Sequence, residues 1–396
     1  MKRIWGELFI VALFLGGPPS FAQKIEMVDG VRTIHNEKDG AWGGTPQVRL
    51  ELLSTFGGDQ PKDPNLAFGA PHDVVIDSHG NIYILDLRNL RIQKLSPEGL
   101  FLQNIGRPGQ GPGDFQAPFS MDIDDADRLY VLDFGNRKIQ VVTAEGKAER
   151  QIKFGSLSMV QVRALRSGEI IMGGLVNLRD LMGFRKKLSP LLTVINSKGK
   201  TQRTFGEMKD YGDINVNARA NWIDIDVDKE DSACVSFRYQ NRLEKYSPEG
   251  ILQWRADRVL NYGTEVIDKG FIRRDHKGIG VQLPTLNTVS QGIAADEEGR
   301  VWIITLNRQM THEETGEEIT VTGKRTVVVE PVIRKMDIYK LEVFGPDGIL
   351  LGDFPLDHLA HGIRICGGFL FIWERTTATV YQYRIWENGA IERRFE

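Results

Sequence analysis

Residues 71–99, PHDVVIDSHGNIYILDLRNLRIQKLSPEG, recur in related form 47 positions later as residues 118–146, PFSMDIDDADRLYVLDFGNRKIQVVTAEG. The identical pairs are Pro71/Pro118, Asp77/Asp124, Tyr83/Tyr130, Asp86/Asp133, Asn89/Asn136, Ile92/Ile139, Gln93/Gln140 and Gly99/Gly146. Apolar positions between these pairs stay apolar. Self-similarity at a fixed spacing is typical of a repeat architecture, so we expect the chain to be an array of similar units.

Each unit predicts four short strands. In the first unit they are expected at residues 74–76, 82–85, 92–95 and 101–105. The third strand ends at Ser96-Pro97-Glu98-Gly99, where Pro presets φ and Gly accepts a positive φ. Four antiparallel strands in slightly under about 50 residues is the size of one β-propeller blade.

Weaker copies of the unit follow and begin near Val160, Ile223, Gly292 and Ile363. The sixth copy lacks a strand, and residues 48–53, followed by Phe56-Gly57-Gly58, look like the fourth strand of a blade without its first three. Pairing of this strand with the C-terminal strands would leave no open sheet edge. We therefore predict an all-β fold in which residues 46–396 form one six-bladed propeller of four-stranded antiparallel blades. A β-solenoid would need a far shorter period.

The repeat resembles the NHL family. The similarity is carried by Pro71-His72-Asp73-Val74, Gly80-Asn81-Ile82-Tyr83, Asp86 and Asn89-Leu90-Arg91-Ile92-Gln93. It is strong in units one and two, fair in four and five, and faint in three and six. Such a resemblance implies the fold and little about function, because this architecture hosts unrelated activities. Eukaryotic relatives carry zinc-binding ubiquitin-ligase modules, a role that a chain without a Cys/His cluster does not support.

The N-terminus has the order of a secretory signal peptide. Lys2 and Arg3 precede an apolar run over residues 8–15, and Ser20-Phe21-Ala22 supplies a small-residue exit. We expect cleavage after Ala22, a periplasmic or extracellular protein without a stable membrane anchor, and a polar leader over residues 23–45. The alternative is a short membrane anchor, although the apolar run is about half of the roughly 20 residues that a span requires.

Charge and cysteine content bear on two questions, whether the protein binds nucleic acid and whether it needs a disulfide. The net charge of −3 arises from 50 basic and 53 acidic residues spread along the chain, so no basic face for nucleic acid is expected. Cys234 and Cys366 lie inside apolar strand-like runs. A disulfide is not required for a chain of this size, and isolated buried thiols are the favoured interpretation.

The mouth of the central channel is the candidate site. In the resembled fold the first strand of every blade lines this channel, and the residues that begin those strands form its rim: His72, Phe119, Val160 or Gln161, Ile223 or Asp224, Gln291 and His361. His72 and His361 belong to neighbouring blades of a closed ring. Beside Gln291 and Asp73, the two imidazoles could bind a divalent metal such as Zn or Ca.

Two enzyme groups share this architecture. The fold resembles that of the peptide-amidating lyases, which place histidines at comparable positions around a metal, but Phe119 stands where a further polar ligand would be expected. Senescence-marker-type lactonases use a Glu/Asn/Asp set that has no recognisable counterpart in this sequence. In an enzyme, Asp73 or Asp224 would be the candidate catalytic base. Asp86 and Asp133 are instead expected to satisfy turn amides, because one active site needs no copy in each blade.

The fifth unit carries an insertion over about residues 307–337. Its β-branched runs on either side of Gly323 predict a hairpin. Residues 309–336 would form either a partner-binding arm or a decoration without a partner. The sequence thus favours a non-enzymatic module that binds a ligand, protein, peptide or glycan through one face or at the channel. A metal-dependent lyase or lactone hydrolase in the channel is the alternative.

Overall fold

The computed structural model describes residues 23–61, 63–154, 159–174, 190–275, 278–311, 314, 320–322, 325–327 and 337–388. Within these ranges the regular structure is almost entirely β-strand, with the short helix α2 (Ile214–Ala220) and a 3-10 turn, η1 (Pro64–Leu66). None of the helical segments in this part of the chain has the length and hydropathy that a bilayer crossing demands. The predicted signal peptide, residues 1–22, lies outside the described residues.

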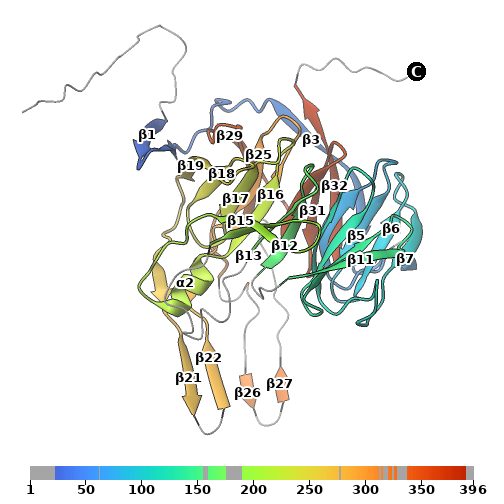
Figure 1. The fold of residues 1–396 in the computed structure, drawn as a ribbon. Helices are drawn as coiled ribbons and strands as arrows, with labels where there is room; N and C mark the ends of the chain where they lie inside the picture. The colour runs from blue at the N-terminus through green and yellow to red at the C-terminus, as the bar shows by residue number, and fades with distance from the viewer. Residues whose placement is uncertain are drawn as a thin grey trace, which may run out of the picture.

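Six four-stranded antiparallel sheets follow one another along the chain (Figure 1). Blade 1 contains β4 (Pro71–Ile76), β5 (Ile82–Asp86), β6 (Arg91–Leu95) and β7 (Phe101–Ile105). Blade 2 contains β8 (Pro118–Ile123), β9 (Leu129–Asp133), β10 (Lys138–Val142) and β11 (Ala148–Lys153). Blade 3 contains β12 (Met159–Ala164), β13 (Ile170–Gly174), β14 (Leu192–Ile195) and β15 (Thr201–Phe205).

The second half of the chain supplies the other three blades. Blade 4 contains β16 (Ile223–Val227), β17 (Ala233–Phe237), β18 (Leu243–Tyr246) and β19 (Leu252–Arg258). Blade 5 contains β24 (Ser290–Ala295), β25 (Val301–Leu306), β28 (Tyr339–Phe344) and β29 (Leu350–Pro355). Blade 6 contains β30 (Gly362–Cys366), β31 (Phe369–Glu374), β32 (Thr379–Glu387) and, from the other end of the chain, β3 (Val48–Gly57).

Strand β3 closes the ring. It pairs antiparallel with β32 along its whole length, from Val48 opposite Glu387 to Gly57 opposite Thr379. The innermost strands β4, β8, β12, β16, β24 and β30 contact one another in this order, and β30 contacts β4. The predicted fold class, a six-bladed propeller completed by an N-terminal strand, is therefore confirmed.

The repeated aspartates accept hydrogen bonds from backbone N–H groups in the turns of blades 1 and 2. Asp77 accepts hydrogen bonds from the backbone N–H groups of His79 at 3.0 Å and Asn81 at 2.8 Å, and from the Tyr83 hydroxyl at 2.9 Å. Asp86 is fully buried and accepts bonds from the N–H groups of Gly69 and Ala70, both at 3.0 Å. Asp133 occupies the same role in blade 2. The interpretation of Asp86 and Asp133 as turn residues is confirmed.

Apolar side chains fill the spaces between neighbouring blades. Tyr83, Leu85 and Ile92 of blade 1, for example, pack with Met121 and Val131 of blade 2, and all five are buried. Each blade thus buries both of its faces. Burial on both faces explains why the second strands β5, β9, β13, β17 and β25 are buried at every position and consist mainly of apolar residues.

Residues 24–36, within the predicted leader, form a hairpin. Strand β1 (Lys24–Val28) pairs with β2 (Val31–Asn36), and β2 lies parallel to β19, which extends blade 4 to six strands. Asn36 fastens this hairpin to blade 5, since its side chain donates to Gly348 O at 3.0 Å and accepts from Leu350 N at 2.7 Å. No local pattern predicts a pairing between strands more than 200 residues apart.

The large departures from the repeat lie on one face, which we call the insertion face. It carries the connections between blades and the loops between second and third strands: α2, β20 (Val266–Asp268), β21 (Phe271–Asp275), β22 (Gly278–Gln282), β23 (Thr285–Leu286), β26 (Thr320–Thr322) and β27 (Arg325–Val327). Figure 1 shows the β21–β22 and β26–β27 hairpins projecting in the same direction on the side of α2. The antiparallel pairing of β26 with β27 confirms the hairpin expected near Gly323, and most of residues 309–336 lie outside the described residues.

Candidate functional site

Charged side chains fill the middle of the central channel. Arg163 of β12 donates to Asp226 of β16 at 2.7 Å, and Arg364 of β30 reaches the same carboxylate at 3.1 Å. Arg364 also pairs with Asp122 of β8, and all four side chains are buried. This cluster, the channel plug, separates two cavities that share no lining residue.

One cavity, of about 200 Å³, opens on the insertion face. Its walls contain the predicted rim residues His72, Phe119, Val160, Gln161, Asp224, Gln291 and His361, together with Asp73. Ile223, the alternative to Asp224, is not among the lining residues. Each of these residues stands at or close to the start of an innermost strand. A propeller brings such positions together from all six blades, which is why residues almost 300 positions apart meet here.

The two histidines are held neutral. Burial, and after it the positive charge of Arg375, lowers the pKa of His72 to about 4. The same two causes lower the pKa of His361 to about 3. His361 Nδ1 accepts a hydrogen bond from the Arg375 backbone N–H at 3.2 Å. His72 Nδ1 is buried and has no hydrogen-bond partner among the described residues.

Two arginines, which reasoning from the rim positions missed, dominate the electrostatics of the cavity. Arg238 follows β17; it donates to both carboxylate oxygens of Asp224 at 3.0 and 3.1 Å and lies 4.7 Å from the centre of the Trp222 ring. Arg375 follows β31 and lines the same cavity. Its guanidinium has no hydrogen-bond or salt-bridge partner within the described part of the chain. Burial, reinforced by Arg238, lowers the pKa of Arg375.

The position of these side chains in the repeat would have allowed their prediction from the sequence. Phe134, Arg238 and Arg375 each directly follow the second strand of their blade, β9, β17 or β31, and all three line the cavity. The residue after the second strand is therefore a second rim position, offset from the first strand. Our sequence reasoning considered only the starts of the first strands and consequently recognised the histidines and overlooked the arginines.

The donor set does not suit a divalent metal. Asp73 accepts from Ser120 Oγ at 3.0 Å and Met121 N at 2.9 Å, and Asp224 is ion-paired with Arg238. Two guanidinium groups border the imidazoles, and a cation beside them would be repelled. Across the described ranges, three or more His, Cys, Asp or Glu residues do not gather in a way that could hold a metal ion. A metal at His72 and His361 stays a prediction.

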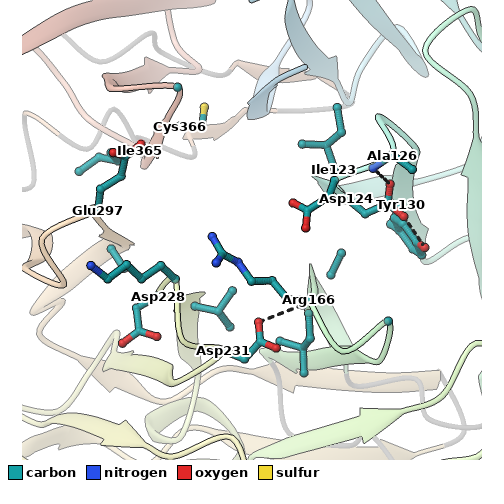
Figure 2. A pocket seen from close by; sticks show the side chains of 18 of the residues that line it. Ile123, Asp124, Ala126, Tyr130, Arg166, Asp228, Asp231, Glu297, Ile365 and Cys366 are labelled. Carbon is teal, nitrogen blue, oxygen red and sulfur yellow. Dashed lines mark hydrogen bonds between the residues drawn. The ribbon is translucent and has the colours of Figure 1, made fainter. Parts of the chain in front are cut away.

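The other cavity, of about 480 Å³, opens on the opposite face at the ends of the innermost strands (Figure 2). Several of its carboxylates already serve the fold: Asp231 accepts from the Arg166 backbone N–H at 3.0 Å, and Asp228 pairs with Lys245 at 2.8 Å. Cys366 lies in its wall, and both Cys366 and Cys234 are free thiols. These roles in the turns make the insertion-face cavity the better candidate site.

Fold and comparisons agree that the chain is a six-bladed β-propeller. A family described as 6-bladed beta-propeller, DUF5128, matches residues 66–233, which span blades 1 to 3 and the start of blade 4. A search among curated proteins finds no sequence match. The match to this family supports the blade assignment and specifies no activity.

Solved structures with the same architecture share little sequence with the chain. A candidate exported protein from Bacteroides fragilis is 10% identical with a TM-score of 0.55, and the match covers 89% of this chain and 99% of that one. A DUF4221 family member from Bacteroides vulgatus is 10% identical with a TM-score of 0.50, covering 86% and 99%. A gluconolactonase from Xanthomonas campestris is 16% identical with a TM-score of 0.48, covering 85% and 90%. The similarities to the two Bacteroides proteins support the fold alone.

Proposed function

We propose that this propeller is a binding protein whose ligand occupies the insertion-face cavity. The supporting observation is that residues lining the cavity carry polar groups without partners among the described residues: the Arg375 guanidinium and the buried atoms His72 Nδ1 and Gln291 Oε1. A buried polar group without a hydrogen bond costs about 1–3 kcal/mol, so a ligand that supplies the missing partners would gain affinity. The cavity is concave and lined by aromatic and polar groups, as small-molecule sites are.

Binding is favoured over catalysis by the state of the ionisable groups. Asp73 and Asp224, the candidate bases, each accept hydrogen bonds from neighbouring groups or an ion-paired arginine. A general base needs a free lone pair aimed at the substrate, and these carboxylates are oriented toward their own partners. The metal-dependent lyase or lactone hydrolase is the competing hypothesis. Elemental analysis of purified protein tests it, and stoichiometric zinc lost in His72→Ala/His361→Ala would favour it.

The cavity is tested directly by filling it. We expect hits from a thermal-shift screen of small metabolites against the purified protein to disappear in Gln291→Trp, because the indole would occupy the cavity. The matched control is Arg166→Trp, which places the same ring at the opposite mouth, where Arg166 is exposed. Circular dichroism checks that both variants fold. If every hit survives in Gln291→Trp, the cavity is not the binding site.

A protein, peptide or glycan partner could also engage the insertion face. We propose residues 309–336 as the contact arm, because loops that depart from a repeat often lie on its binding face. Deletion of residues 309–336 should leave the fold intact, as circular dichroism can check, and weaken partner capture in pull-downs. If the deletion variant captures every partner at undiminished yield, residues 309–336 are not the interface.

We further propose a periplasmic or extracellular location, which rests on the signal-like order of residues 1–22. Expression of the full chain in a bacterial host, followed by fractionation and mass spectrometry of the N-terminus, tests this proposal. A mature protein that begins at Gln23 in the periplasm or medium is the expected result. Retention of Met1 in the cytoplasmic fraction would contradict it.

A further inference from the structure

We infer that the cavity recognises a small monocarboxylate with an aromatic body. The carboxylate would lie against Arg375 and Arg238, and the ring would lie against Phe119 and Phe134. This inference rests on the proposed function and adds the chemical class of the ligand. It depends on how charge and aromatic surface are divided around the ring of blades.

The polar side of the cavity spans blades 4 to 6. Arg238 comes from blade 4, Gln291 from blade 5 and Arg375 from blade 6, so the two guanidinium groups flank the amide of Gln291. Arg238 Nε is buried and unpartnered among the described residues, although the Nη2 of the same side chain binds Asp224. The guanidinium group of arginine binds a carboxylate through two parallel hydrogen bonds, so we expect a carboxylate to bind on the polar side of the cavity.

Direct ion pairing leaves one cation of the cavity, Arg375, to meet a ligand. Asp224 pairs with Arg238, and Arg163 lies 2.7 Å from Asp226 and 3.7 Å from Asp73, the other carboxylate of the cavity wall. Both imidazoles are neutral, since their pKa values lie at about 4 and about 3. Arg375 thus has no salt-bridge partner among the described residues. A single carboxylate would supply one, whereas a dianion would bring a second negative charge close to Asp73 and Asp224.

The aromatic side of the cavity spans blades 1 and 2. The Phe119 ring stands edge-to-face with His72 at 5.5 Å and with Phe134 at 5.8 Å between ring centres. All three residues line the cavity and are partly exposed to it. Aromatic walls favour a flat apolar group through offset or edge-to-face packing. Blades 1 and 2 lie across the ring from blades 4 and 5, whereas blade 6, which carries Arg375, adjoins blade 1. One molecule would therefore place its carboxylate at Arg375 and Arg238 and its ring on the adjoining aromatic wall.

A neutral sugar is the main competitor for such a cavity, because aromatic rings and polar side chains also bind glycans. A sugar would satisfy Gln291 and His72 but would leave the charge of Arg375 without a counterion. Keeping an unpaired cation in a partly buried cavity is unfavourable, as the lowered pKa of Arg375 reflects. Charge therefore distinguishes the two classes of ligand.

The test is isothermal titration calorimetry of the purified protein with three matched pairs of probes. The pairs are phenylacetate and phenylacetamide, 3-phenylpropionate and its amide, and indole-3-acetate and its amide. Each amide keeps the shape of the acid and removes its charge. We expect at least one acid to bind with a Kd below about 1 mM and to bind at least tenfold more tightly than its amide.

Two variants locate the carboxylate. Arg375→Gln should weaken binding of the acid by about tenfold to a hundredfold, as expected for the loss of a hydrogen bond to a charged group, and should leave the amide unaffected. Arg375→Lys should restore part of the affinity because the charge returns. Arg166→Gln, at the opposite mouth, is the matched control and should bind as the wild type does.

The outcomes separate this inference from the proposed function. Equal binding of acids and amides, or undiminished acid binding by Arg375→Gln, would overturn the carboxylate assignment. If no acid binds but neutral screening hits disappear in Gln291→Trp, the cavity binds a different class and only the inference fails. If neither the acids nor any screening hit depends on the cavity, the proposed function fails as well.

Discussion

The channel plug offers the sharpest prediction of stability. Arg364 projects from β30 and contacts two buried carboxylates, Asp226 at 3.1 Å and Asp122, while Arg163 holds Asp226 from the other side. Arg364→Met removes the charge and keeps much of the apolar volume. Asp122 is then left without an ionic partner, and Asp226 keeps Arg163. Breaking a buried ion pair by removing one partner costs about 3–5 kcal/mol, so we expect a loss of this size.

Urea unfolding at pH 7, followed by tryptophan fluorescence, measures this loss as a lower midpoint at an unchanged slope. Arg166→Met is the control: Arg166 is exposed at the opposite mouth, and its substitution should change the free energy of unfolding by less than about 0.5 kcal/mol. A loss below about 1 kcal/mol in Arg364→Met would contradict the reasoning, because such a value is ordinary for a solvated charge.

A double-mutant cycle shows whether the loss arises from the ion pair. Asp122 has Arg364 as its ionic partner and also accepts a hydrogen bond from Ala164 N at 2.7 Å. Arg364→Met/Asp122→Leu should be less destabilised than the sum of the two single variants, with a coupling energy of about 0.5–3 kcal/mol. Strict additivity would mean that packing of the Arg364 stem, rather than its charge, stabilises the ring.

Three further predictions concern other sites. The hydrogen bond from His35 to Asp257 at 2.7 Å raises the pKa of His35. Protonated His35 therefore stabilises the fold fully below about pH 6.5, and this stabilisation is lost as the pH rises through the pKa of His35 in the folded state. Melting curves of His35→Gln should differ from wild type at pH 5.5 and coincide with it at pH 9. Arg375→Leu should raise the melting temperature, because it removes a charge that burial disfavours, and a lower melting temperature would contradict this. Burial raises the pKa of Cys234 and of Cys366 to about 12, so the folded protein should react slowly with a disulfide reagent at pH 8 and the unfolded protein should react at both thiols.

Much of the fold was predictable because its information is local. The Asp-to-Tyr spacing recurs in blades 1 and 2 because Asp77 bonds the amides two and four residues ahead and the hydroxyl of Tyr83, and Asp124 bonds Tyr130 in the same way. The missing strand of blade 6 was predictable for a related reason, since a propeller with an open edge would expose an unpaired sheet. The hairpin over residues 24–36 was not predictable, because its parallel partner β19 lies in blade 4 and leaves no periodic trace.

The candidate site, too, was predictable from the sequence only in part. Repeat spacing placed His72, Gln291 and His361 at the starts of first strands, the resembled fold implied that these strands are innermost, and the ring brings the three residues to one cavity. Only the tertiary structure decided their chemistry: burial in the closed ring, and after it the charges of Arg375 and Arg238, lowers the pKa of His72 and of His361. Such charge interactions depend on distances between side chains from different blades, and these distances are set by closure of the ring rather than by any neighbouring residue in the chain.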